Sequence, residues 1–534
     1  MNLQRICWMT AIAMTMVAML LHFFSVSIAG GLWRDEVGLV NIAGLPTWKE
    51  IFWGLMHDHC PIVFPAVIRT WTALGLAQTD TGLRVLGLWV GLFLLASFWA
   101  ASRMMAKNPP LLSLAVAALN PVVIRYGDSM RAYAFGTALM TLTVGLMWRF
   151  IERPGWRPGL LAGAAAVVSV QTLYQNAFFL LAICVAGVAV SFRQRQFSKI
   201  GGILSIGFVA ALSLMPYLKP IHDAQTWWLV SKTGINLAVA LSRISELSDN
   251  FFGVWVVVVI LAVLVGIGRI FFKALQEGAI EQPDLPLFGG IAISLGATGF
   301  GVFIKLTGLP TQAWYYIPVL CFTMVCCDSV FPRVFSLTRF GVLAVALFAL
   351  VYSPSAFSAL RWRQTNGDLL AAQVSKMATA DDFIIVHPWY YGITFSYYYK
   401  GVVKWTTLPP IMDHRFHRYD LIKEKLQTPN AIVPVLEQVE ATLRSGHRVW
   451  VIGEFSAPRT GAPPPGDPPV APNGSSRWLD EPYSIAWGKR LAYLLKHHAA
   501  KTTLLVTAST NSILINPMEK MTLTVASGWQ TNSP

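Results

Sequence analysis

The chain has 534 residues, of which 54% are hydrophobic and 13% are charged, and its mean hydropathy is +0.52. This composition excludes an ordinary soluble globular protein and indicates a protein embedded largely in a lipid bilayer. The net charge of +14 comes mainly from short loops between apolar runs. It therefore orients the chain in the membrane and does not indicate nucleic-acid binding.

Apolar runs long enough to cross the roughly 30 Å of a bilayer core recur through the first two-thirds of the chain. We expect about eleven transmembrane helices, and the runs that start at residues 110 and 159 are short for this task. The predicted spans are 7–29, 83–101, 110–125, 132–149, 159–173, 176–192, 200–217, 252–271, 286–305, 314–331 and 340–354. Together they predict a polytopic α-helical membrane domain over residues 1–354.

Basic residues fall in alternate loops between these runs, which is the distribution that marks the cytoplasmic side of a membrane protein. They are Arg5, Arg103, Lys107, Arg149, Arg153, Arg157, Arg193, Arg195, Lys199, Arg269, Lys273, Arg333 and Arg339. The sequence therefore predicts a multi-pass protein of the plasma (inner) membrane with a cytoplasmic N-terminus. An odd number of spans places the C-terminal third outside.

The first predicted external loop, residues 30–82, begins with Arg34, Asp35 and Glu36 directly after the first apolar run. Ionisable groups are costly at the edge of a membrane bundle. The cluster is thus either a solvated helix end or a catalytic site that faces a lipid-borne substrate. Apolar residues with helical spacing over 48–56 predict a helix in the membrane interface, and residues 62–76 predict a second short helix.

The region from residue 355 to residue 534 is predicted to be an extracytoplasmic α/β domain. Its predicted strands are 383–388, 402–408, 448–455, 502–507 and 521–526, and its predicted helices are 367–378, 430–445 and 482–498. A proline-rich loop, 457–476, interrupts this pattern. The domain has no cysteine, so disulfides do not hold it together.

Four polar clusters fall on the predicted external face, far apart in the sequence. They are Arg34–Glu36, His57–Pro61, Arg125–Tyr133 and Gln171–Asn176. Transfer of a sugar from a lipid-linked phosphate needs a carboxylate base for the acceptor hydroxyl and cations for the departing phosphate. A carboxylate on one loop and arginines on another meet both demands.

The ordered set of motifs resembles the GT-C glycosyltransferases of the protein-O-mannosyltransferase and aminoarabinose-transferase type. Asp35-Glu36 matches the acidic motif of their first external loop, and His59-Cys60-Pro61-Ile62 matches a His-Pro-Pro-Leu-like element with cysteine in place of a proline. Arg131-Ala132-Tyr133 matches an Arg-x-Tyr element. Leu173–Asn176 resembles their Thr-His-Tyr-x segment but lacks its histidine, and Trp314–Pro318 resembles an Arg-Tyr-x-x-Pro element but lacks its arginine.

This resemblance implies that Asp35 is the catalytic base. Glu36 is then a second catalytic residue, through acceptor contact, metal binding or support. The predicted substrate-binding residues are Arg34, Asp58, His59, Arg125, Asp128, Arg131, Tyr133, Tyr174, Asn176 and Lys219. No cofactor is certain; one alternative is a divalent metal ion held by His57, His59 and Glu36.

The expected partners are a polyprenyl-phosphate sugar donor, an envelope glycan, lipid or protein acceptor, and the bilayer, with no nucleic acid. The expected activity is an inverting, single-displacement glycosyl transfer. Three alternatives stay open at this point: an oligosaccharide or O-antigen ligase, a non-enzymatic transporter of lipid-linked sugars, and an assembly scaffold. The transporter is disfavoured because few charges lie at mid-span positions.

Overall fold

The computed structural model describes residues 3–58, 60–228, 237–271, 284–308, 311–331, 336–453, 463–471, 479–505 and 513–531. The chain forms two compact units. The first contains residues 1–27, 59–219 and 234–361, and the second contains residues 28–58, 220–233 and 362–534. The predicted first external loop, residues 30–82, is thus divided between the units.

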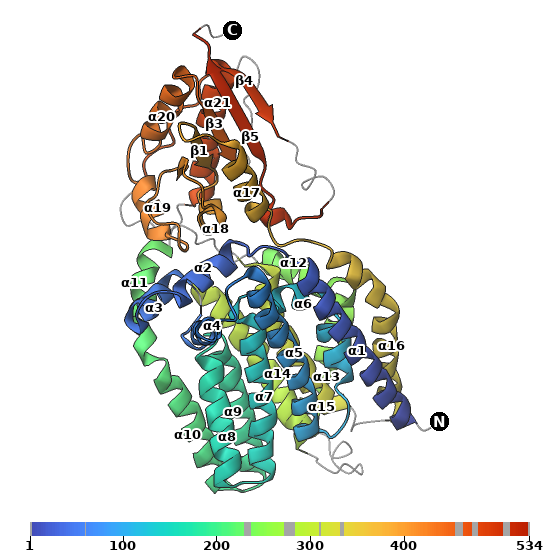
Figure 1. Ribbon diagram of the computed structural model, residues 1–534. Helices are drawn as coiled ribbons and strands as arrows, with labels where there is room; N and C mark the ends of the chain where they lie inside the picture. Colours follow the sequence, from blue (N-terminus) through green and yellow to red (C-terminus); the bar gives the residue numbers. More distant parts are fainter. Residues whose placement is uncertain are drawn as a thin grey trace. The chain divides into compact units, whose positions relative to one another are not determined.

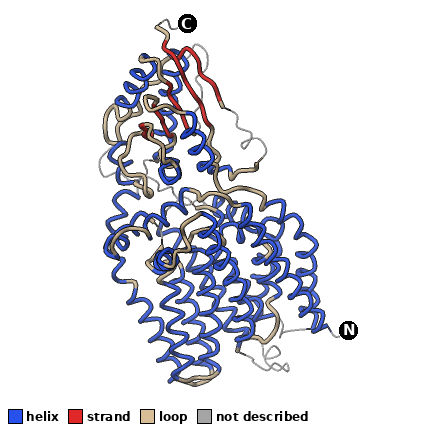
Figure 2. Tube along the Cα trace, viewed as in Figure 1, coloured by secondary structure: helices blue, strands red, loops and turns tan. Residues whose placement is uncertain are grey.

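The first unit is a bundle of apolar helices (Figures 1 and 2). Its elements are α1 (Leu3–Ile28), α4 (Val63–Ala73), α5 (Asp80–Met105), η2 (Ser113–Ala118), α6 (Pro121–Gly127), α7 (Ala132–Glu152), α8 (Trp156–Val170), α9 (Asn176–Arg193), α10 (Phe197–Ser213), η3 (Met215–Tyr217), α12 (Leu237–Ser248), η4 (Asp249–Phe251), α13 (Phe252–Phe271), α14 (Leu285–Thr307), η6 (Ala313–Tyr316), α15 (Ile317–Val330) and α16 (Ser336–Ala359). α11 (Leu218–Trp228) begins in the first unit and continues into the second.

Eight helices of the described chain are long and apolar enough to cross a membrane. A ninth span results if α12 and α13, which meet at a bend of 105°, count as one broken span. The protein is therefore an integral, multi-pass membrane protein, as predicted. The predicted total of about eleven spans stays a prediction, because α8 has only 15 residues and falls short of a bilayer core.

The predicted span 110–125 is not one continuous helix, which corrects the sequence interpretation. It consists of the π-helical segment η2 and the short helix α6, separated by Leu119 and Asn120. Asn120 ends the first segment and caps the second, because its side chain accepts hydrogen bonds from the backbone N–H groups of Val122 and Val123. The hydropathy of the sequence indicates only a continuous apolar run and cannot predict this break.

Buried polar contacts hold the start of the π-helical segment to α15. The carboxylate of Asp328 accepts hydrogen bonds from the backbone N–H groups of Leu112 and Ser113, at 2.8 and 2.9 Å, and from the Ser113 hydroxyl at 2.7 Å. Every residue of α15 is buried, including Cys321, Cys326 and Cys327, which are all free thiols. These three cysteines therefore lie inside the packed helix bundle.

The second unit is built around a five-stranded sheet in the order β2-β1-β3-β5-β4. The strands are β1 (Phe383–Val386), β2 (Lys404–Thr407), β3 (Arg448–Ile452), β4 (Ala499–Leu504) and β5 (Leu523–Trp529). β1 runs parallel to β2 and β3, whereas β5 runs antiparallel to β3 and β4. All five predicted strands are confirmed, although their ends shift by a few residues.

Helices cover both faces of this sheet (Figure 1). On one face, α19 (Tyr419–Leu426), α20 (Val433–Arg444) and α21 (Asp480–His498) cover Ile385 and Val451. On the other, α17 (Gly367–Met377) and α18 (Tyr391–Tyr398) cover Ile384 and Trp450. The three predicted helices are confirmed as α17, α20 and α21. The proline-rich loop 457–476 lies partly outside the described residues, and its described part, 463–471, forms neither helix nor strand.

The start of the first external loop belongs to the second unit. It forms α2 (Arg34–Ala43), α3 (Trp48–Gly54) and η1 (Leu55–His57). The Tyr398 hydroxyl accepts a hydrogen bond from the Leu32 backbone N–H at 2.6 Å, and the Ala29 carbonyl accepts one from the Gln364 N–H at 2.8 Å. Asn41 donates to the Arg415 carbonyl at 2.7 Å. The predicted helices over 48–56 and 62–76 are confirmed as α3 and α4.

Candidate functional site

The acidic motif forms the first turn of α2, where the positive end of the helix dipole favours carboxylates. Glu36 is fully buried, and its Oε2 accepts a hydrogen bond from the Trp33 backbone N–H at 3.1 Å. This bond caps the helix in the manner of a capping-box glutamate. Glu36 therefore supports the start of α2, while the side chain of Asp35 keeps 21% of its surface exposed.

A buried ion pair fixes Arg34 beside this turn. Its Nη1 donates to Glu519 Oε1 at 2.5 Å and to the Met518 carbonyl at 2.8 Å, and its guanidinium lies 4.6 Å from the centre of the Tyr390 ring. The side chain of Glu519 is fully buried, and burial raises the pKa of its carboxyl to about 7 even though Arg34 opposes this shift. Arg34 thus joins α2 to η8 (Pro517–Glu519). Its predicted substrate contact stays a prediction.

The imidazole of His417 lies beside the Asp35 carboxylate. Its Nε2 lies 3.6 Å from Asp35 Oδ1, which makes an ion pair when the imidazole is protonated. The ring of His417 stacks on Tyr419 at 5.9 Å and meets the edge of Trp389 at 6.2 Å. These two aromatic rings orient the imidazole toward Asp35.

His57 lies between two aromatic rings at the end of η1. It stacks on Phe416 at 4.9 Å and on Trp227 at 5.5 Å. Burial lowers the pKa of His57 to about 4, and the nearby Asp420 only partly offsets this shift. His57 is therefore neutral at pH 7, and Asp58 beside it is buried.

No group of three or more His, Cys, Asp or Glu side chains in the described part of the chain has a metal-site arrangement. His59, predicted both as a substrate contact and as a metal ligand, lies outside the described residues. Glu36 caps α2 and His57 stacks between two rings, so neither adds to a metal site through its described contacts. The divalent metal stays a prediction.

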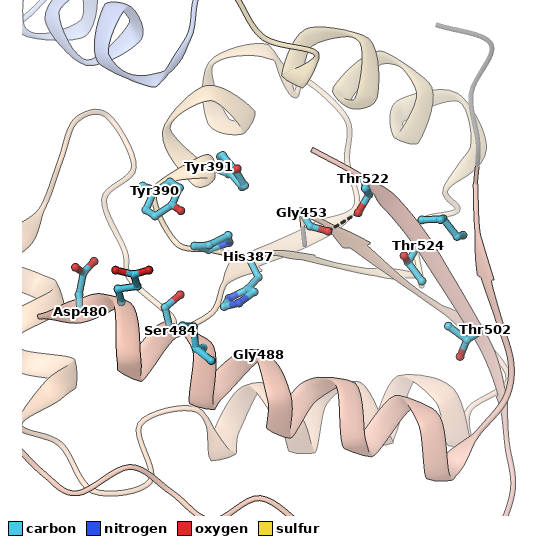
Figure 3. Close-up of a pocket in the computed structure, with 14 residues that line it drawn as sticks. His387, Tyr390, Tyr391, Gly453, Asp480, Ser484, Gly488, Thr502, Thr522 and Thr524 are labelled. Atoms are coloured by element: carbon cyan, nitrogen blue, oxygen red, sulfur yellow. Dashed lines mark hydrogen bonds between the residues drawn. The ribbon is translucent and has the colours of Figure 1, made fainter. Parts of the chain in front are cut away.

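The second unit also holds a cavity of about 930 Å³, shown in Figure 3. We name it the Asp480 pocket. Its lining includes His387, Tyr390, Gly453, Asp480, Ser484 and Thr524. Asp480 Oδ2 accepts a hydrogen bond from Trp389 Nε1 at 2.9 Å, and burial raises the pKa of the Asp480 carboxyl.

In the first unit, several predicted binding residues have partners inside the helix bundle. Asp128 is buried, and its Oδ1 accepts a hydrogen bond from Nδ1 of His22 on α1 at 2.6 Å. Arg125 donates to the Ala359 carbonyl. Asn176 is fully buried and donates to the Gly136 and Ser169 carbonyls, at 2.9 and 3.1 Å. These contacts give all three residues a role in joining helices; substrate contact by them stays a prediction.

Aromatic contacts bring two of the sequence motifs together. Tyr133 lies 5.9 Å from Tyr315, and Tyr126 stacks on Trp314 at 4.3 Å. Arg131 precedes α7 at its N-cap position, and its guanidinium lies 5.8 Å from the Tyr133 ring. The Arg-x-Tyr element and the Trp-Tyr-Tyr element therefore share one face of the bundle.

A hydrogen-bond chain likewise joins the loop after Cys60 to the segment around Gln171. The Val63 N–H donates to the Gln171 carbonyl at 3.0 Å, and the Tyr217 hydroxyl donates to Gln171 Oε1 at 2.6 Å. Tyr174 meets the edge of Tyr217 at 5.7 Å, and Lys219 is exposed at the start of α11. Within the first unit, the segment that follows the predicted cluster 57–61 therefore contacts the predicted cluster 171–176.

The site residues predicted from the sequence do not include Glu519, Tyr390 or His417. Glu519 and His417 lie 484 and 382 residues from Asp35 in the sequence, so local spacing carries no signal for them. A buried glutamate in a short segment between two strands is the one feature that could have drawn attention.

No protein-family model matches the chain, and a search of curated proteins finds no match either. Among solved structures, ArnT from Cupriavidus metallidurans in the apo state is similar with a TM-score of 0.52 and 12% sequence identity. The alignment covers 83% of this chain and 92% of that chain. The chain therefore shares the fold of ArnT.

Two further structures are similar with lower scores. ArnT bound to undecaprenyl phosphate gives a TM-score of 0.47 with 13% identity, over 83% of this chain and 92% of that chain. The other is the archaeal oligosaccharyltransferase AglB from Archaeoglobus fulgidus in complex with an inhibitory peptide and a dolichol-phosphate. Its TM-score is 0.48 at 10% sequence identity, and the alignment covers 83% of this chain and 69% of that chain.

Proposed function

We propose that this protein is a membrane glycosyltransferase. It moves a sugar from a polyprenyl-phosphate donor to an extracytoplasmic glycan, lipid or protein acceptor. The observation that carries the proposal is the environment of Asp35. A half-buried carboxylate stands at the start of α2, and Glu36, Arg34 and His417 hold the turn around it. The fold shared with ArnT and the ordered sequence motifs support the same reaction class.

The step that fits this environment is a single displacement. The acceptor hydroxyl oxygen forms a bond to the anomeric carbon while the bond from that carbon to the donor phosphate breaks, which inverts the anomeric configuration. Asp35 takes the hydroxyl proton as general base, and the polyprenyl phosphate leaves with the bonding electrons. The nearby His417 imidazole accepts or shares this proton afterwards and returns the carboxylate to its charged form.

The leaving phosphate needs a cation in the transition state. We assign this role to Arg131 from its Arg-x-Tyr motif and from its position at the start of α7. Arg125 is a weaker candidate because its guanidinium already donates to the Ala359 carbonyl. In this proposal, Glu36 positions the turn that carries Asp35.

The test compares cells that express the wild-type chain with cells that express Asp35→Asn. Mass spectrometry of envelope glycans from cells with and without the protein identifies the transferred mass. A single sugar supports the proposed transfer, whereas a whole glycan indicates an oligosaccharide ligase. Asp35→Asn should lower transfer by about 10²- to 10⁴-fold, the usual contribution of a general base.

Asp381→Asn is the matched control, because Asp381 is an exposed acid of the same unit in the turn between α17 and β1. It should leave transfer unchanged. Full transfer by a well-expressed, folded Asp35→Asn protein would refute the role of Asp35 as base.

A further inference from the structure

The Asp480 pocket lies at the carboxyl ends of two neighbouring parallel strands. His387 follows β1 and Gly453 follows β3, and both line the cavity. From β1 the chain continues into α18 on one face of the sheet, whereas α21, the helix that follows β3 among the described elements, covers the other face. Open α/β sheets bind ligands in the crevice where their connections diverge in this way. The position therefore favours a binding site.

Two glycines allow the close approaches that shape this cavity. Gly453 has a φ of +112°, and a Cβ at this position would lie 1.6 Å from the His387 carbonyl oxygen. A Cβ on Gly488 would lie 2.6 Å from His387 Nε2. The imidazole therefore fits against α21 only because residue 488 has no side chain.

The lining carries many hydroxyls and two acids. Thr502, Thr522 and Thr524 line one side of the cavity, and Ser484, Asp480 and Glu481 on α21 line the other (Figure 3). None of the described lining residues is a lysine or an arginine. Such a surface suits a ligand with several hydroxyl groups. It disfavours phosphate and carboxylate groups, and it favours an ammonium group.

Two buried polar groups in this lining have hydrogen-bonding capacity left over. Ser484 is 6% exposed, and its Oγ has no hydrogen-bond partner among the described residues. His387 is 3% exposed, and its Nδ1 lies 3.3 Å from the Leu408 carbonyl oxygen. Burial lowers the pKa of His387 to about 4, so the ring is neutral at pH 7 and its Nε2 is an acceptor. Buried polar groups in proteins are nearly always satisfied, so the Ser484 hydroxyl points to an occupant, for which the His387 Nε2 is a further acceptor.

The pocket is also connected to the Asp35 environment through two aromatic side chains. Tyr390 lines the cavity and contacts the Arg34 guanidinium. Trp389 donates to Asp480 and meets the edge of the His417 ring. An occupant of the pocket would therefore lie within two side chains of Asp35, in the same unit of the protein.

We propose that the Asp480 pocket binds one saccharide unit of the acceptor, that it prefers a sugar with a free amine, and that it excludes an acidic sugar. The lining of the pocket supports the binding of a saccharide. That this saccharide is part of the acceptor rests on the proposed transferase function. Thr502, Thr524 and Ser484 bond the ring hydroxyls, and Asp480 and Glu481 pair with the ammonium group.

The experiment measures binding of three probes to the full-length protein in lipid nanodiscs by saturation-transfer NMR. The probes are methyl glucosaminide, methyl glucoside and glucuronic acid. We expect methyl glucosaminide to bind most tightly, methyl glucoside more weakly, and glucuronic acid not at all. Asp480→Asn should lower the ratio of the affinities for methyl glucosaminide and methyl glucoside about tenfold. The asparagine side chain can still accept the hydrogen bond from Trp389.

Thr502→Val removes one hydroxyl at nearly constant side-chain volume. It should lower the affinity for methyl glucosaminide and for methyl glucoside by about five- to tenfold. Thr503→Val is the matched control, because its side chain points to the opposite face of β4 by strand alternation. Equal binding of glucuronic acid, or equal affinity losses in Thr502→Val and Thr503→Val, would overturn the proposal.

Asp35→Asn distinguishes the two proposals from each other. It should lower transfer by about 10²- to 10⁴-fold and leave probe binding unchanged. If Asp35→Asn transfers normally while the probes still bind as expected, the transferase mechanism fails and the saccharide site stands. If transfer depends on Asp35 but the probes do not bind, the saccharide site fails alone.

Discussion

The buried pair of Arg34 and Glu519 should be the main electrostatic anchor of α2. In Arg34→Met, the Glu519 carboxylate stays fully buried without its cation. Removing one partner of a buried ion pair typically costs about 3–5 kcal/mol, because the remaining charge is uncompensated. For a unit of this size, about 2–4 °C of melting temperature corresponds to each kcal/mol. We therefore expect the second unit to melt about 10 °C lower.

The pH dependence follows from the carboxyl of Glu519. Burial already raises its pKa to about 7 with Arg34 present, and loss of Arg34 raises it further. In Arg34→Met the folded state then binds a proton more tightly than the unfolded state does. Its stability should therefore rise as the pH falls from 8 toward the unfolded carboxyl pKa of about 4.5. Arg34→Met should be more destabilising at pH 8 than at pH 5.5.

The double variant Arg34→Met/Glu519→Gln removes the stranded charge and should be more stable than Arg34→Met at pH 8. The assay is thermal unfolding of the purified full-length protein, followed by tryptophan fluorescence. Arg415→Met is the control, because Arg415 pairs with Asp413 at an exposed position and such pairs contribute about 0–1 kcal/mol. Equal melting shifts for Arg34→Met and Arg415→Met, or strict additivity in the double variant, would refute this account.

Two further predictions concern buried polar groups. The pKa of His387 is about 4 in the folded state and about 6.5 in the unfolded state. Its neutral imidazole therefore contributes fully to the free energy of unfolding above pH 6.5. This contribution is lost as the pH falls toward 4, by about 3 kcal/mol in total. Melting curves between pH 7 and pH 4.5 should show a smaller acid-induced drop for His387→Gln than for the wild type, and equal drops would contradict this prediction. In α15, Asp328→Ala leaves the Leu112 and Ser113 N–H groups unpaired and should cost about 3 kcal/mol, whereas Asp328→Asn keeps one acceptor and should cost less. Thermal unfolding in detergent checks this order, and a milder effect of alanine than of asparagine would contradict it.

The sequence predicted the strands of the α/β domain because they are short runs that contain β-branched and aromatic residues, such as FIIV in β1 and RVWVI in β3. It missed α18 and α19 for different reasons. α18 has the sequence YGITFSYY, whose aromatic and β-branched residues favour strands, yet it is helical where it covers the sheet. α19 is a single charged stretch of 8 residues, too short for a periodic signal. Contacts within the unit outweigh local propensity at both places.

In the candidate site, too, some residues could be predicted from the sequence and others could not. The position of Asp35 after the first span was enough to single it out, because charged residues are rare in this chain. Its neighbours Glu519 and His417 come from distant segments, and no local pattern predicts them. Conversely, Asn176 and Asp128 carry polar groups that satisfy helix–helix contacts, and sequence cannot tell such groups from substrate ligands.

The second unit also constrains the number of membrane crossings. Residues 28–58 and the C-terminal domain form one unit, joined by the pairs of Arg34 with Glu519 and Asp35 with His417, so they lie on the same side of the membrane. Residues 220–233 belong to the same unit, so the stretches 59–219 and 234–361 must each cross an even number of times. Four of the long apolar helices begin in the first stretch, whereas three lie in the second. At least one further element must therefore cross within 234–361, and the candidate among the described residues is the bent α12–α13 pair. An odd total follows, and that parity agrees with the orientation predicted from the basic loops.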